Sequence, residues 1–225
     1  MAAISVSYEG AKNFFYQLFS RRNVIKEFPR AAGKVAIVTG GNCGIGYETA
    51  RGLIRSGMTV IMGCRSEKAA ESAIQHLKDE QPDARAHSSG SINFEDLQSK
   101  KSYSRFGAYA QAKVANVLFT YALQRRLSID STHVTANALH PGVVNTELFR
   151  HLPWIARAPM GLFFLTPEQG AATSLYACLS PDLEGVGGKY LANCEVQSSS
   201  AYSYNEDIQE RLWCVSRELT GIGNE

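Results

Sequence analysis

The sequence predicts an α/β fold built around a parallel β-sheet. Two kinds of segment lead to this prediction: short β-branched runs that end in glycine, and longer segments whose apolar residues recur at helical spacing. Between residues 34 and 81 they alternate in the order strand, helix, strand, helix. Such alternation is typical of parallel strands joined by right-handed crossovers. At 225 residues, the chain is long enough to bury the core of one domain.

The first four elements follow from local signals. KVAIVTG, which starts at residue 34, predicts a buried strand that ends near Thr39. Residues 41–57 then have helical spacing of small and apolar side chains, with Gly57 as the stop signal. MTVIMGCR, residues 58–65, predicts the second strand. Residues 66–81 predict a helix with Ser66 as its N-cap.

The remaining elements are less regular. Residues 82–106 are polar and predict no strand of appreciable length. A helix that contains Tyr109 follows them. A strand at 133–141, a helix opened by Thr166 and Pro167, and a strand at 184–192 follow. Residues 205–221 predict a polar helix whose inner face is made of Leu212, Trp213, Val215 and Leu219.

Composition excludes several classes of function. The net charge of +2 arises from 23 basic and 21 acidic side chains without a long basic run, so we expect no nucleic-acid partner. The five cysteines form neither a CxxC motif nor a Cys/His spacing suited to zinc, so we expect free thiols and no metal site.

The first 33 residues predict an amphipathic extension ahead of the domain. They lack a basic region followed by an unbroken apolar core, so they do not predict a signal peptide, and no spanning helix is evident in the sequence. The apolar residues of 14–19 precede Arg21 and Arg22, which suits a short helix on a membrane surface. Packing of the same helix on the domain is the alternative.

A glycine-rich loop, TGGNCGIG, joins the first strand to its helix. Gly40, Gly44 and Gly46 supply positions without a β-carbon for the turn, for the approach of phosphate oxygens and for close packing. A helix N-terminus that follows such a loop can bind a pyrophosphate. The alternative is a turn that binds nothing. The dinucleotide prediction assigns the loop residues Thr39, Gly40, Asn42, Cys43, Gly44, Ile45 and Gly46 to the cofactor.

The end of the second strand indicates which dinucleotide is bound. An acidic residue there would hold a ribose 2′-hydroxyl, but Cys64 and Arg65 occupy this place. The guanidinium of Arg65 suits a 2′-phosphate, so NADP is expected, with NAD as the second choice. A plain surface role for Arg65 is the alternative.

Tyr109 and Lys113 stand four residues apart in the next helix, SYSRFGAYAQAKVANVLFTYALQRRL. At this spacing, both side chains project from one helical face and can reach the same point. The pair could be a proton donor with its modulating cation, or only a surface pair.

Four segments together resemble the short-chain dehydrogenase/reductase family, in particular its retinol-dehydrogenase-like and polyprenol-dehydrogenase-like branch. They are TGGNCGIG, YAQAK as Y-x-x-x-K, HPGVVNT and TPEQGA, and the resemblance runs from about residue 34 to 221. It implies a Rossmann-type doubly wound sheet and hydride transfer between NADP(H) and an alcohol or carbonyl carbon. Tyr109 would pass the proton, and Lys113 would lower its pKa and hold the nicotinamide ribose. Pro141, Gly142, Val143 and Thr146 would complete the cofactor site.

The resemblance also bears on substrate and location. The apolar segment 152–165 occupies the place of the family's substrate lid and suits a lipophilic alcohol such as a retinoid or polyprenol. Packing of this segment on the core would explain the same residues. The expected location is the cytoplasmic side of a lipid surface, such as the endoplasmic reticulum membrane or a lipid droplet, and a homo-oligomer is compatible with the family.

An internal block of the family pattern is missing. Only 27 residues separate Gln81 from Tyr109, whereas three strand-helix units need about 90. The N-N-A-G segment and the catalytic serine are absent, and Ser89 is a candidate surrogate. The sheet is therefore expected to be incomplete, with about four strands and the middle and one edge strand absent, in a single truncated domain over 34–225. The alternative function is a catalytically impaired remnant that binds nucleotide or a sister chain.

Overall fold

A computed structural model describes residues 29–80, 86–88, 105–130, 133–144 and 164–222. The chain divides into two compact units, 1–92 with 141–180, and 93–140 with 181–225. The predicted N-terminal extension lies outside the described residues apart from 29–33, and the apolar segment 152–165 lies outside them apart from 164 and 165. The division into an extension and one domain therefore stays a prediction.

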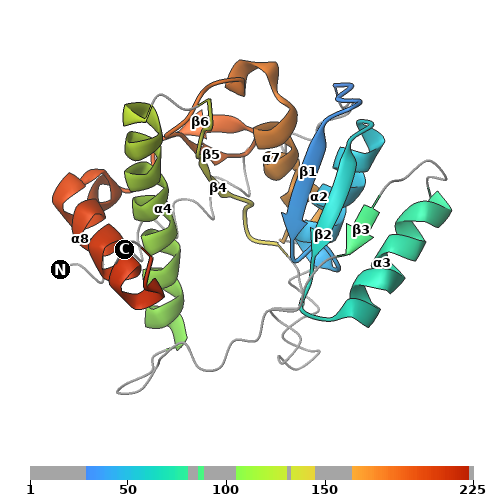
Figure 1. Cartoon of the computed structure of the whole chain (residues 1–225), viewed down its shortest axis with the longest axis horizontal. Coiled ribbons are helices and arrows are strands. Elements are labelled where there is room, and N and C mark those ends of the chain that lie inside the picture. The colour runs from blue at the N-terminus through green and yellow to red at the C-terminus, as the bar shows by residue number, and fades with distance from the viewer. Residues whose placement is uncertain (1–28, 81–85, 89–104, 131–132, 145–163, 223–225) are drawn as a thin grey trace. The chain divides into compact units, whose positions relative to one another are not determined.

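The first unit contains a parallel sheet in the order β1-β2-β3 (Figure 1). Its strands are β1 (Val35–Thr39), β2 (Thr59–Gly63) and β3 (Ala86–Ser88). β1 and β2 pair in register along their whole length, from Val35 opposite Thr59 to Thr39 opposite Gly63. The sheet confirms the α/β prediction with parallel strands.

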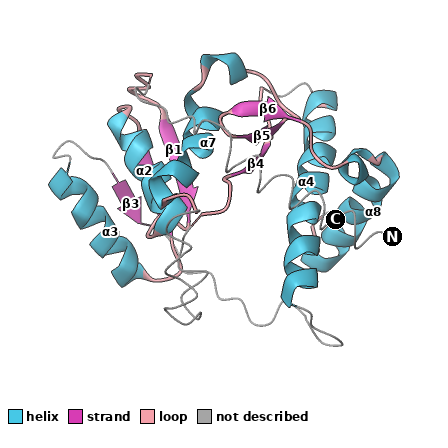
Figure 2. Ribbon diagram, turned by 180° about the vertical axis from the view of Figure 1, so that it is seen from behind, coloured by secondary structure: helices cyan, strands magenta, loops and turns pink. Residues whose placement is uncertain are grey.

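Among its described residues, this unit has three helices: α2 (Gly44–Arg55), α3 (Glu67–Glu80) and α7 (Pro167–Leu179). The reverse view shows α2 against the strands (Figure 2). Inward residues of β1 and β2 pack on apolar residues of the helices, and the fully buried members of this core include Ala50, Leu53, Val60, Met62 and Leu77. This core holds the start of α2 at a fixed place beside the ends of the strands.

Helix α7 packs closely on α2 because α2 has a glycine at the contact. A β-carbon at Gly52 would lie 2.5 Å from Cδ1 of Leu175, so any larger residue would force the Leu175 side chain to move. The predicted cap of α7 is confirmed. The Thr166 hydroxyl accepts from the Gln169 amide, and the Gln169 side chain accepts from the Thr166 amide, which forms a capping box.

The outer face of β1 departs from the buried strand that the sequence predicts. Val35 and Ile37 are 61% and 73% exposed, whereas Ala36 and Val38 on the other face pack against the core. Among the described strands, β1 pairs only with β2. A β-branched run of this kind normally has strands on both sides and helices on both faces. The exposure of Val35 and Ile37 agrees with the loss of a block that would supply these neighbours.

The second unit contains a small mixed sheet and two long helices. Its strands are β4 (Ala138–His140), β5 (Tyr190–Ala192) and β6 (Glu195–Gln197), with β4 parallel and β6 antiparallel to β5. Its helices are α4 (Arg105–Ile129) and α8 (Glu206–Thr220), and two 3₁₀ turns lie at Pro181–Leu183 and Ala201–Tyr204.

Two short strands were missed by the sequence prediction, and two were predicted too long. β3 and β6 have three residues each and carry polar side chains, so their propensity is weak, and they exist because a neighbouring strand offers hydrogen bonds. β4 and β5 cover only three residues of the predicted 133–141 and 184–192. In place of one sheet of about four strands, the described residues form two three-stranded sheets, one in each unit.

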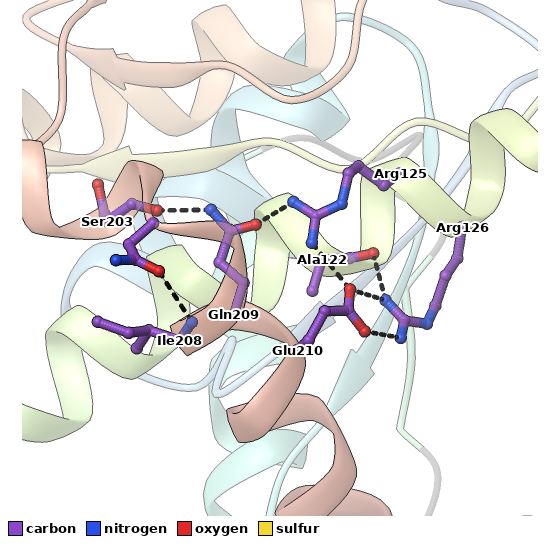
Figure 3. Close-up of polar contacts among 8 residues, drawn as sticks. Ala122, Arg125, Arg126, Ser203, Ile208, Gln209 and Glu210 are labelled. Atoms are coloured by element: carbon purple, nitrogen blue, oxygen red, sulfur yellow. Dashed lines mark hydrogen bonds and ion pairs between the residues drawn. The ribbon is translucent and has the colours of Figure 1, made fainter.

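Helix α8 is clamped to α4 by a cluster of polar contacts (Figure 3). Arg126 donates to both carboxylate oxygens of Glu210, at 3.1 and 2.6 Å, and Arg125 donates to the same carboxylate at 2.8 Å. Gln209, 2% exposed, accepts from Arg125 and donates to the carbonyl of Ser203 at 2.7 Å. The Arg126 guanidinium also lies 4.1 Å from the ring centre of Trp213. The clamp fixes the C-terminal half of α4.

The inner face of α8 differs from the predicted one. Gln209, Glu210 and Trp213 contact α4, and the Trp213 ring stacks on Phe119 with 5.0 Å between centroids. Val215 and Leu219, predicted to face inward, are 44% and 68% exposed. The cause is that arginines of α4 bind the polar positions of α8, which turns the apolar residues outward.

Acid should weaken the clamp. The two arginines lower the pKa of Glu210 from 4.5 to about 2, with the Arg126 hydrogen bond as the largest cause. A lowered pKa means that the ionised carboxylate stabilises the folded chain above pH 4.5, and this stability is lost as the pH falls toward 2. We expect Glu210→Gln to lower the melting temperature at neutral pH. Between pH 4.5 and pH 2, the melting temperature of this variant should fall less steeply than that of the unmodified chain. The near-ultraviolet signal of Trp213 measures the transition. Glu206→Gln, in the same helix but outside the cluster, is the control. Parallel declines in all three proteins would contradict the assignment.

Candidate functional site

The glycine loop turns sharply at the end of β1. Gly40 and Gly44 have φ of +69° and +56°, in the left-handed region that glycine adopts without strain. The Gly40 amide donates to the Gly63 carbonyl at 2.7 Å, which ties the end of β1 to the end of β2. The loop therefore leaves the sheet at a fixed point and direction.

Gly46 closes the loop. A β-carbon at Gly46 would lie 2.2 Å from the carbonyl oxygen of Gly40 and 2.9 Å from its carbonyl carbon. Any other residue would force the backbone of the loop apart. The spacing of the glycines thus has a structural reason, because the first and last of them touch.

The N-terminus of α2 suits an anion. Its N-cap residue, Cys43, has an extended backbone and makes no side-chain cap, and the first turn of the helix contains no acidic residue. The first amides of a helix and its dipole favour negative charge, and a side-chain cap or a carboxylate would compete for that place. The local chemistry therefore fits a phosphate group.

Pro141–Val144, part of a second segment that the sequence assigned to the cofactor, lies beside α2 within the same unit. The Leu165 amide donates to the Val143 carbonyl at 2.9 Å, and Val144 forms a parallel bridge with Leu165. A β-carbon at Gly170 of α7 would lie 2.6 Å from Cγ2 of Val144 and 3.3 Å from Cγ1 of Ile45. Gly170 thus lets this segment approach the first turn of α2. Thr146, which the sequence also assigned to the cofactor, is outside the described residues.

A shallow pocket of about 430 Å³ opens between the loop and α3. This volume is in the range of small-molecule sites. The pocket is lined by Asn42, Cys43, Gly44, Tyr47, Ala69, Ser72, Ala73 and His76. The first three are residues that the sequence assigned to the cofactor. Tyr47 and the lining residues of α3, such as Ser72 and His76, were not assigned to it. Arg65 follows β2 and is exposed. The spacing of Ala69, Ser72, Ala73 and His76 on one face of a helix was the signal that could have revealed this lining.

Tyr109 and Lys113 lie one turn apart in the first half of α4, as the sequence predicted. The side chain of Tyr109 is outside the described residues, and Lys113 is exposed. His140, at the end of β4, is a neighbour that sequence reasoning missed. Burial lowers its pKa, and the positive charge of Lys113 lowers it further. His140 is therefore neutral at physiological pH and leaves the charge near this point to Lys113.

The described residues contain no cluster of three or more His, Cys, Asp or Glu side chains that could hold a metal ion. All five cysteines are free thiols. In the part of the chain that the structure describes, no helix is both long and apolar enough to cross a membrane.

Comparison with known proteins identifies the family. The model of the short chain dehydrogenase family matches residues 34–90, which span β1 to β3. Human polyprenol dehydrogenase is 32% identical over 317 residues, and the alignment covers 98% of this chain and 96% of that protein. The chain belongs to the short-chain dehydrogenase/reductase family. Members of this family are oxidoreductases that bind a nicotinamide dinucleotide, which agrees with the loop and the N-terminus of α2.

Further members show the same relationship. Mouse retinol dehydrogenase 14 is 45% identical over 139 residues, or 59% of this chain and 41% of that protein. A crystal structure of an uncharacterised Mycobacterium paratuberculosis protein has a TM-score of 0.66 at 19% identity and covers 89% of this chain and 98% of its own. L-sorbose reductase from Gluconobacter frateurii, solved with NADPH and L-sorbose, has a TM-score of 0.52 at 14% identity, covering 74% and 97%. These structures share the family fold.

The length of the alignment locates a difference between this chain and its family. The alignment with human polyprenol dehydrogenase spans 317 residues, whereas this chain has 225, a difference of 92. The family model, moreover, matches no further than residue 90. Both observations agree with an internal block being absent after β3.

The link between Lys113 and His140 can be tested directly. Lys113→Met removes the nearby positive charge, so the pKa of His140 should rise. It should stay below 6.5, because burial is the larger cause of the shift. An NMR titration of the His140 ring measures this. Lys189→Met, which removes an exposed lysine beside β5 of the same unit, should leave the titration unchanged. An unaltered His140 in Lys113→Met would show that the two groups do not interact.

Proposed function

We propose that this chain moves a hydride between NADP(H) and a lipophilic alcohol or its carbonyl product. The observation that carries the proposal is the meeting of two cofactor segments within one unit. The glycine loop, closed by Gly46 on Gly40, leads into an uncapped helix N-terminus, and Pro141–Val144 packs beside that helix at Gly170. The resemblance to the family assigns both segments to the dinucleotide site, which supports the proposal.

The loop residues, from Thr39 to Gly46, would hold the pyrophosphate through backbone amides. Arg65, exposed after β2, would bind the 2′-phosphate of NADP, and the absence of a carboxylate at this place removes what would repel it. The nicotinamide ring supplies the hydride chemistry when the cofactor is bound. Pro141, Gly142, Val143 and Thr146 would line the nicotinamide end.

Tyr109 and Lys113 would manage the proton. A phenol with pKa near 10 is a poor acid-base group at neutral pH until a nearby cation favours the phenolate. The backbone of α4 places Lys113 one turn after Tyr109, and neutral His140 does not add a second positive charge that would weaken the lysine. Lys113 would thus lower the pKa of Tyr109 and hold the nicotinamide ribose, while Tyr109 exchanges a proton with the substrate oxygen.

The substrate class rests on the relatives. One is named for polyprenol and another for retinol, both lipophilic alcohols. Such substrates reside in lipid, so we propose that the chain works at the cytoplasmic side of a lipid surface. The apolar segments that would contact it are 14–19, which is outside the described residues, and 152–165, of which only 164 and 165 are described.

A second candidate is a chain that binds nucleotide without turnover. Two observations favour it: the exposed outer face of β1, at Val35 and Ile37, and the 317-position alignment with polyprenol dehydrogenase, in which at least 92 positions have no residue of this 225-residue chain. The serine that would give the substrate oxygen its second hydrogen bond belongs to the absent block. Ser89, the candidate surrogate, is outside the described residues.

The cofactor preference is tested by thermal shift. NADPH should raise the melting temperature more than NADH, and Arg65→Asp should reverse that order. Loss of a charge-assisted contact should weaken NADPH affinity about tenfold or more. Arg30→Asp, the same charge change ahead of the opposite end of β1, is the matched control and should preserve the preference. Equal shifts with both nucleotides in the unmodified chain would remove the basis for NADP.

Turnover separates the two candidates. We expect this chain to oxidise retinol or a polyprenol about 10²–10³ times more slowly than a chimera carrying the missing block from human polyprenol dehydrogenase, because one oxyanion hydrogen bond is lost. Tyr109→Phe should remove the remaining turnover and keep the NADPH thermal shift. A thermal shift without any turnover would support the non-catalytic candidate. If the chain matched the chimera, Ser89→Ala should abolish its activity.

A further inference from the structure

Helix α8 has an apolar stripe on a face that α4 does not cover. The stripe consists of Ile208, Leu212, Val215 and Leu219, whose spacing of four, three and four residues is that of a coiled-coil seam. It lies beside, and not on, the face of Gln209 and Trp213 that contacts α4. Exposure increases along it, from partly buried Ile208 and Leu212 to 44% at Val215 and 68% at Leu219.

We propose that this stripe binds α8 of a second copy of the chain in antiparallel orientation. An apolar seam of this spacing is matched by another such seam. Pairing the stripe with its own reverse sets Ile208 against Leu219 of the partner subunit and Leu212 against Val215 of the partner subunit. The contact is isologous, so it closes as a dimer and leaves no free stripe.

The charges beside the stripe fit this orientation. Arg211 and Glu218 both immediately precede a stripe residue and are both exposed. In the antiparallel register, Arg211 and Glu218 of the partner subunit lie within about 3 Å along the axis, two residues at 1.5 Å each. A parallel pairing would leave them seven residues, about 10 Å, apart along the axis. The antiparallel dimer therefore forms two opposite-charge pairs, one at each end.

The charges also disfavour a lipid surface as the occupant. Helices that lie on membranes have basic polar faces. The charged residues of α8 are Glu206, Asp207, Glu210 and Glu218 against Arg211 and Arg217, so the helix is net acidic. An anionic membrane would repel it, whereas a second α8 in the antiparallel register places Glu218 beside Arg211.

The expected dimer is weak. A stripe of four side chains buries less area than the roughly 800 Å² per partner of a stable interface, so a dissociation constant in the micromolar range is expected. The cost of a like-charge contact in such an interface is large compared with its total strength, which makes association sensitive to single charge reversals.

Sedimentation of the full chain from low micromolar to millimolar concentration tests the proposal. Arg211→Glu and Glu218→Arg should each weaken self-association about tenfold or more, because each places like charges together at both ends. Mixing the two variants should restore a dimer made of one of each, and the double variant should self-associate like the unmodified chain. Only the antiparallel register predicts this rescue.

Leu219→Glu should leave the chain monomeric. Thr220→Glu adds the same charge one residue away from the stripe, and this variant should still dimerise. Far-ultraviolet circular dichroism checks that each variant is folded. If a single variant does not fold, the double variant, Arg211→Glu with Glu218→Arg, still tests the proposal. A monomeric unmodified chain throughout the range, or a mixture that fails to dimerise, would overturn the proposal. So would a monomer that sediments with phosphatidylcholine vesicles and loses this binding in Leu219→Glu, because the stripe would then bind lipid.

Discussion

The candidate cofactor site depends on one close backbone contact, between Gly46 and the carbonyl of Gly40. This contact turns the chain from β1 into α2 within a few residues and leaves the helix N-terminus facing the ends of the strands. A second glycine, Gly170, allows Pro141–Val144 to reach the same helix. A backbone contact at Gly46 and a close side-chain contact at Gly170 therefore bring together segments that are about 100 residues apart in the sequence.

Glycine also governs how the helices of the first unit pack. Gly52 lets α7 approach α2 at Leu175, so the helix that presents Gly170 is held at the same place as the helix that carries the loop. In the second unit, charge takes this role. Glu210 binds two arginines of α4, and Trp213 stacks on Phe119 and lies under Arg126. The long helix that carries Tyr109 and Lys113 is thus fixed at its far end, away from the reacting groups.

The family of this chain indicates an oxidoreductase, whereas the exposed outer face of β1 indicates a sheet that has lost neighbouring elements. The chain belongs to a family of oxidoreductases, and human polyprenol dehydrogenase aligns with 98% of it. Yet Val35 and Ile37 lie exposed on a strand whose sequence is that of a buried one. A strand that lacks one set of neighbours keeps its local structure through α2 and β2 but loses half of its burial. The glycine loop keeps its conformation because its contacts are with β1, β2 and α2, all of which are present.

The sequence alone determined the elements with strong local signals, and only the tertiary structure decided those that depend on a neighbour. The glycine loop, the Thr166 cap and the Tyr109 helix were predictable because their causes lie within a few residues. β3 and β6 were not, because a three-residue segment with two polar side chains becomes a strand only when another strand pairs with it. The outward turn of Val215 and Leu219 was hidden for the same reason, since the arginines that rotate α8 come from α4, about 85 residues earlier. His140 became part of the site only through the fold, which buries it near the charge of Lys113.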